Sequence, residues 1–75
     1  MTYQKFRVSN LTKKELERAI KEANLTATQL QIIIELNKEE RDDSGIMAML
    51  SLGKSKYYAE KRIALKKLIH VLHDS

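Results

Sequence analysis

The amino-acid sequence predicts an all-α fold, a small domain of four helices, and three observations support this prediction. The 75-residue chain has no Pro and only two Gly, so few residues interrupt a helix. Two segments begin with the same helix-capping pattern, and the last third of the chain has apolar residues at a helical spacing. Hydrophobic residues make up 43% of the chain, which is enough for the core of one domain spanning residues 1–75.

The first eleven residues are the least regular part of the sequence. Tyr3, Phe6 and Val8 are apolar enough to cover a core, and Lys5 and Arg7 are candidates for contact with phosphate. Because chain ends are usually poorly ordered unless something ties them down, we favour a frayed N-terminal arm over residues 1–11.

Two capping boxes mark the starts of the first two helices. Thr12 is followed three residues later by Glu15, and Thr26 is followed in the same way by Gln29. In each pair the Thr hydroxyl accepts a hydrogen bond from the later backbone N–H, and the later side chain accepts one from the Thr N–H. We therefore predict two helices, near residues 13–23 and 27–38.

A short helix and a long one are predicted after the acidic stretch at 39–44. Ser44 is a candidate cap for a helix near 45–51, and Gly53 is predicted to take the left-handed conformation after it. Ser55 is a candidate cap for the last helix, near 56–72. On a helical wheel of this last helix one stripe is predicted to face the core. The stripe consists of Tyr58, Leu65, Leu68, Ile69 and Leu72, with Lys56, Glu60 and Lys67 opposite.

Positive charge is concentrated in the same last helix. The net charge of the chain is +4, and residues 54–67 hold six bases against one acid, Glu60. Such a concentration of positive charge is suited to binding nucleic acid, an anionic membrane surface or an acidic protein. Two helices joined by a tight Gly-containing turn, the second of them basic, are typical of a helix-turn-helix, predicted here at about 45–67.

A helix-turn-helix places the start of its second helix in the major groove of DNA. We expect the basic side chains to contact the phosphate backbone. These are Lys54, Lys56, Lys61, Arg62, Lys66 and Lys67. The residues best placed to approach base edges are Ser55, Lys56, Tyr57 and Glu60.

The segments Leu52–Tyr58 and Ala64–Leu68 resemble the end of bacterial sigma-70 region 4. They are more similar still to small phage-encoded regulators of the ArpU type, which share the Tyr-rich start of the last helix. The upstream segment Leu25–Gln29 is also common in that group, so the resemblance covers about residues 25–70. It departs from the group's pattern at Lys54, where an apolar residue is usual. The resemblance implies promoter-type DNA binding and transcriptional control in a phage or mobile element.

Enzymatic activity is not expected. The chain has no Cys, no Gly-rich phosphate loop and no set of nucleophile and base at a recognisable spacing. No cofactor is expected either, and no metal, because His70 and His73 suit the end of a helix better than a metal site. No apolar run approaches the roughly 20 residues that span a bilayer, and no apolar signal core is present. We therefore expect no membrane partner and a cytoplasmic location in a bacterial host cell.

The expected partner is double-stranded DNA, bound by a homodimer formed through Val71 and its apolar neighbours, with RNA polymerase as a further partner. Two alternatives remain open. One is a small helical antagonist that binds a repressor, a polymerase or a nuclease. The other is an accessory protein that bends DNA during recombination. The antagonist predicts no binding to DNA alone, and the accessory protein predicts binding to attachment sites instead of promoters.

Overall fold

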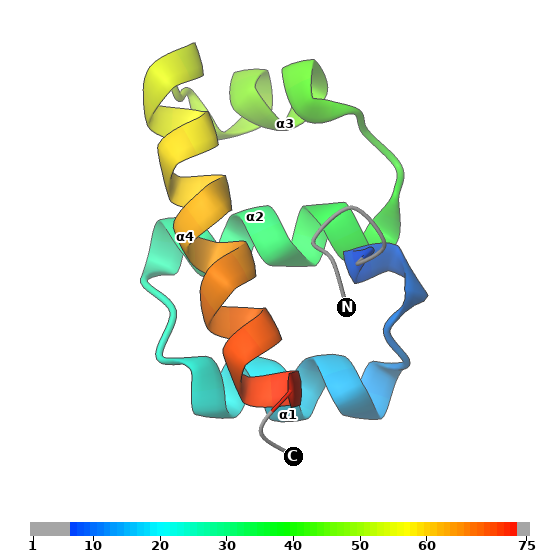
Figure 1. The fold of residues 1–75 in the computed structure, drawn as a ribbon. Helices are drawn as coiled ribbons and strands as arrows, with labels where there is room; N and C mark the ends of the chain where they lie inside the picture. The colour runs from blue at the N-terminus through cyan, green and yellow to red at the C-terminus, as the bar shows by residue number, and fades with distance from the viewer. Residues whose placement is uncertain (1–6, 74–75) are drawn as a thin grey trace.

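The computed structural model describes residues 7–73, which fold into four α-helices and one short 3₁₀ turn without any strand. This confirms the predicted all-α fold. The helices are α1 (Lys13–Ala23), α2 (Ala27–Lys38), α3 (Asp43–Leu50) and α4 (Lys54–His73), preceded by the turn η2 (Val8–Asn10). In Figure 1, α1, α2 and α3 lie one above another, and the long α4 runs across them from α3 towards α1.

Two apolar clusters form the core, and α4 contributes to both. The first cluster joins η2, α1, α2 and α4, and the second joins α2, α3 and α4. The buried members of the first are Val8, Ala19, Ala23, Ile33, Ala64 and Leu68. Those of the second are Ile32, Ile46 and Tyr57. Because Leu36 packs against both groups, the two clusters form one continuous interior.

Both predicted capping boxes are present. The Thr12 hydroxyl accepts a bond of 3.1 Å from the Glu15 N–H, and the Thr26 hydroxyl accepts one of 3.2 Å from the Gln29 N–H. In each box the later side chain bonds back to the Thr backbone N–H. The observed bounds of α1 and α2 equal the predicted ones. Their starts are specified locally, because a capping box involves residues only three positions apart.

The starts of α3 and α4 differ from the prediction. Asp42, not Ser44, caps α3, and its carboxylate accepts a 2.8 Å bond from the Gly45 N–H. Ser51, not Gly53, takes the left-handed conformation after α3, with φ of 56°. The Tyr57 N–H donates to the Gly53 carbonyl at 2.9 Å, so α4 begins at Lys54. Ser55 therefore lies inside the first turn of α4 and does not cap it.

The predicted inward stripe of α4 is correct in part, because Leu68 is buried and Leu65 and Leu72 pack against the first cluster, but the buried line is rotated away from Tyr58. Tyr57 is fully buried, whereas Tyr58, predicted to face the core, is 41% exposed. The buried line on α4 runs through Tyr57, Ala64 and Leu68. The small Ala64 lies in the first cluster with Ala19 and Ala23 of α1, where small side chains let two helices approach closely. A wheel centred on large apolar residues misses this position.

The described part of the N-terminal arm is packed, not frayed. Val8 is 5% exposed and belongs to the first cluster. The Asn37 side chain donates to the Val8 carbonyl at 2.9 Å, which ties η2 to the end of α2. Tyr3, Lys5 and Phe6 lie outside the described residues. Within residues 7–73 no helix has the combination of length and apolar character that crossing a membrane requires.

Candidate nucleic-acid interface

A tight turn joins α3 to α4 and fixes the direction in which α4 leaves. The Ser51 N–H donates to the Ala48 carbonyl at 3.2 Å, and the Leu52 N–H donates to the Met47 carbonyl at 3.0 Å. Both bonds fold the chain back onto the last turn of α3, as in helix C-capping motifs. The first turn of α4 then packs on α2 and α3 through Tyr57.

A carboxylate at the start of α3 holds two side chains of α4. The Tyr57 hydroxyl donates to Asp43 Oδ1 at 2.6 Å, and Lys61 Nζ lies 3.0 Å from the same oxygen. Burial would raise the pKa of Asp43, but the hydrogen bonds from Tyr57 and Lys61 outweigh it and lower the pKa below its ordinary value. Burial, together with the bond to Asp43, raises the pKa of the Tyr57 hydroxyl. This cluster links the start of α3 to the first two turns of α4.

The structure places two of the predicted DNA-binding residues in contacts within the fold. Tyr57 has no exposed surface, so it cannot approach a base edge while the domain is folded. Lys61 is committed to Asp43, and its side chain is only 23% exposed. Both residues serve the packing of α3 against α4.

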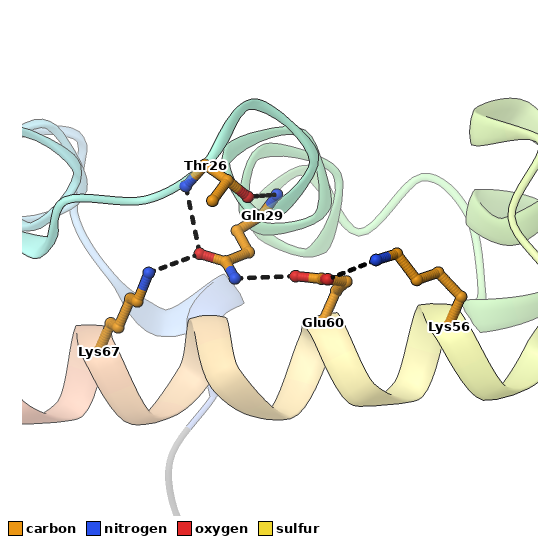
Figure 2. A network of polar contacts seen from close by, with 5 residues as sticks. All are labelled: Thr26, Gln29, Lys56, Glu60 and Lys67. Atoms are coloured by element: carbon orange, nitrogen blue, oxygen red, sulfur yellow. Dashed lines mark hydrogen bonds and ion pairs between the residues drawn. The ribbon is translucent and has the colours of Figure 1, made fainter.

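A second polar network joins α2 to α4 (Figure 2). The buried Gln29 side chain accepts bonds from the Thr26 N–H at 3.2 Å and from Lys67 Nζ at 2.9 Å. Its amide nitrogen donates to Glu60 Oε1 at 2.8 Å. The other oxygen of Glu60 pairs with Lys56 Nζ at 3.0 Å. The bond from Gln29 and the contact with Lys56 lower the pKa of Glu60, which therefore stays ionised at neutral pH.

Glu60 and Lys67 are thus turned towards α2 and not outward as predicted. The Glu60 side chain is 16% exposed, and Lys67 Nζ also donates to the Asn24 carbonyl at 3.1 Å. Sequence reasoning missed Gln29 as their shared partner. The available signal was the Gln in the second capping box, because an amide can accept from the cap and donate elsewhere at the same time.

The remaining predicted residues stay exposed. We call this set the outer face of α4, and it includes Tyr58, which was predicted to be core. The outer face consists of Lys54, Ser55, Lys56, Tyr58, Arg62 and Lys66. Lys54, Arg62 and Lys66 form no ion pair with any other residue from 7 to 73. Because Glu60, the one acid within α4, is turned inward, the exposed charges of the outer face are all positive.

The structure brings no metal-ligand set together within the part of the chain that it describes, where no three His, Cys, Asp or Glu side chains are grouped. Val71, predicted to lie at a dimer interface, packs against the first core cluster of its own chain. No family model, curated protein sequence or solved structure matches the chain.

Proposed function

We propose that this protein binds double-stranded DNA through the outer face of α4, with α3 and α4 acting as a helix-turn-helix. The observation that supports the proposal is the one-sided charge of that face. Four basic side chains are exposed there, and of these only Lys56 has an ion pair within residues 7–73, with Glu60. Asp43 of α3 and Glu60 of α4 are themselves bonded to Tyr57 and Gln29. A surface whose exposed charges are positive suits a phosphate backbone.

Different residues along α4 are suited to phosphate contacts and to base contacts. Lys54, Arg62 and Lys66, which have no ion pair within residues 7–73, would contact phosphate, which gives affinity without sequence preference. Ser55 and Tyr58, in the first turns of the helix, would approach base edges in the major groove, whose width of about 12 Å admits a helix. Lys56 would exchange Glu60 for a phosphate. The polar networks behind α4 hold it at a fixed angle, so base contacts need no rearrangement of the fold.

The wider role that we propose is sequence-specific transcriptional regulation in a phage or mobile element. Its basis is the resemblance of the last two helices to regulators of the ArpU type. Binding as a homodimer and contact with RNA polymerase belong to the same proposal. A single domain of this size contacts few base pairs, and a dimer would double the number of sites read.

Fluorescence anisotropy with random duplex DNA at several salt concentrations tests the proposal. We expect binding with a Kd of about 10⁻⁴ to 10⁻⁶ M and a slope of log K against log salt near −3 to −4, if about four phosphates are neutralised. Arg62→Glu should weaken binding roughly tenfold or more, because it places a carboxylate against phosphate. Lys13→Glu makes the same kind of charge change at an exposed position of α1. It is the matched control and should change affinity much less.

Two results would contradict the proposal. One is the absence of binding even at low salt, and the other is an equal loss of affinity in the two variants. Selection from a random pool then tests specificity, since a regulator should enrich a common sequence. A folded protein that binds DNA without enriching any sequence would overturn the regulatory part alone.

A further inference from the structure

A shallow hollow lies along one flank of α4. It has a volume of about 500 Å³, and its walls are mostly apolar. It is lined by Tyr58, Lys61, Arg62, Leu65 and Lys66. The apolar surface comes from the Tyr58 ring, from Leu65 and from the aliphatic stems of the basic residues. Because Lys61 bonds to Asp43 at 3.0 Å, the hollow lies beside the start of α3.

The charge around this hollow is positive. Asp43 neutralises Lys61, but Arg62 and Lys66 have no ion pair with any described residue. These two cations lie one helical turn apart, so their side chains start about 5–6 Å from each other. An adjoining hollow of about 570 Å³ shares Lys61 and Leu65 but is lined by both acids and bases. Of these two hollows, the first combines an apolar floor with a net positive rim.

We propose that this hollow binds an acidic amphipathic helix of a partner protein. Duplex DNA could neutralise Arg62 and Lys66, but it offers little apolar surface to cover Tyr58 and Leu65. A partner helix can satisfy both demands. Its large apolar side chains would fill the hollow, and carboxylates one turn apart would pair with the two cations. Burial of the apolar floor adds to the charge attraction at about 25 cal/mol per Å².

This inference does not rest on DNA binding, although it has a consequence for it. The hollow shares Tyr58, Arg62 and Lys66 with the outer face of α4. A helix bound there would occupy the surface proposed for DNA, so the two partners would exclude each other. An acidic partner helix would thereby control access to DNA.

The test uses the full chain and a fluorescent helical peptide of about 14 residues, or four turns. The peptide carries Leu and Phe one turn apart, flanked by Glu. A second peptide of equal charge has Ser in place of Leu and Phe. We expect the apolar peptide to bind at least about tenfold more tightly, equivalent to ~1.4 kcal/mol. Tyr58→Ala should remove most of that difference.

Ile63→Ala is the matched control for Tyr58→Ala. The two side chains are almost equally exposed, at 42% and 41%, but they project about 140° apart around the helix. Ile63→Ala should bind the apolar peptide like the parent protein. A circular-dichroism spectrum of each variant checks that the fold is kept. Neither residue is a buried member of a cluster, but Tyr58→Ala also removes the edge contact between the Tyr58 and Tyr57 rings, so a urea midpoint is measured for both variants as well.

Several outcomes separate this inference from the proposed function. Equal affinity for the two peptides would show attraction by charge alone and overturn the inference, as would an equal loss in Ile63→Ala. Binding of DNA but not of the apolar peptide would overturn it and leave the proposed function standing. Binding of the apolar peptide but not of DNA would support the inference and overturn the proposed function. If both bind, the peptide should displace labelled DNA.

Discussion

Tyr57 and Tyr58 are neighbours in the sequence but have different surroundings. The Tyr57 ring is buried between α2, α3 and α4, and its hydroxyl bonds to Asp43. The Tyr58 ring packs edge-on against it, with ring centres 5.1 Å apart, and is 41% exposed. Successive helical residues project about 100° apart, so only one of the two can enter the core. The choice leaves Tyr58 as the aromatic side chain of α4 that is available to a partner.

Tyr57→Phe should lower the free energy of unfolding by about 1–2 kcal/mol, as expected for a buried hydrogen bond to a charged group. The ring still fills its place, so the loss reports the bond between the hydroxyl and Asp43, 2.6 Å long. Urea unfolding at neutral pH measures it. An unchanged midpoint would mean that water replaces the hydroxyl as partner of Asp43 without loss.

The penalty of Tyr57→Phe should depend on pH. The pKa of Asp43 is below its ordinary value of 3.8 in the folded protein, so its ionised form stabilises the fold above that pH. This stability is lost as pH falls through the folded pKa. The difference between Tyr57→Phe and the parent should therefore shrink in acid. A penalty of constant size down to pH values well below 3.8 would contradict the assigned role of Asp43.

From the sequence, Asp43 and Glu60 can be recognised only as acids, one before the basic helix and one within it. The sequence does not show which residues their carboxylates contact. The direction of each carboxylate depends on partners 14 and 31 residues away, Tyr57 and Gln29. Local patterning carries no information about such distances. For this reason the basic residues of α4 could be named from the sequence, but those committed to the fold could not be separated from those left exposed.

At the scale of elements, α1 and α2 begin in the same way but are connected differently. Glu15 completes a capping box that is exposed and bonds only within its own turn. Gln29 completes an equivalent box but also bonds to Glu60 and Lys67 of α4. The second box therefore both starts a helix and fastens it to the neighbouring one.

Glu15→Ala and Gln29→Ala make a matched pair of substitutions at this scale. Glu15→Ala should cost about 0.5–1 kcal/mol, the usual range for losing part of a helix cap. Gln29→Ala should cost about 2–3 kcal/mol, because it also removes a buried partner of charged groups. Thermal or urea unfolding of both variants measures the difference. Equal losses would show that the link between α2 and α4 adds nothing to stability.

The bounds of α1 and α2 could be predicted because Thr12 and Thr26 each combine a capping box with a Leu directly before the cap and another four residues after it. Before α3, Asp42 and Ser44 are both suitable caps, and before α4 both Gly53 and Ser55 are suitable. The structure uses the earlier residue in each case. An earlier start of α3 puts Asp43 within reach of Tyr57 and Lys61. Contacts between helices thus settle a choice that local capping leaves open.

At the scale of the whole molecule, α4 is the element that unites the fold. It packs against both α1 and α2 and places Tyr57 in one cluster and Leu68 in the other. The number and order of helices could be predicted from capping and breakers. The rotation of α4 could not, because it is set by the close packing of Ala64 with the buried alanines of α1.

This arrangement predicts that the domain unfolds as one unit. Leu68→Ala, in the first cluster, should cost about 2–5 kcal/mol, a large share of the 5–15 kcal/mol typical of a whole domain. Because α4 runs through both clusters, the loss should appear equally in far-ultraviolet circular dichroism, which reports helix, and in the near-ultraviolet tyrosine signal, to which the buried Tyr57 contributes. In Ile46→Ala, in the second cluster, the helix signal and the tyrosine signal should likewise be lost at the same temperature.

If Leu68→Ala lost helix at a temperature where the tyrosine signal persisted, α1 and the end of α4 would form a separate unit. The angle of α4 would then depend on α2 and α3 alone, and its outer face would stay in place when α1 unfolds.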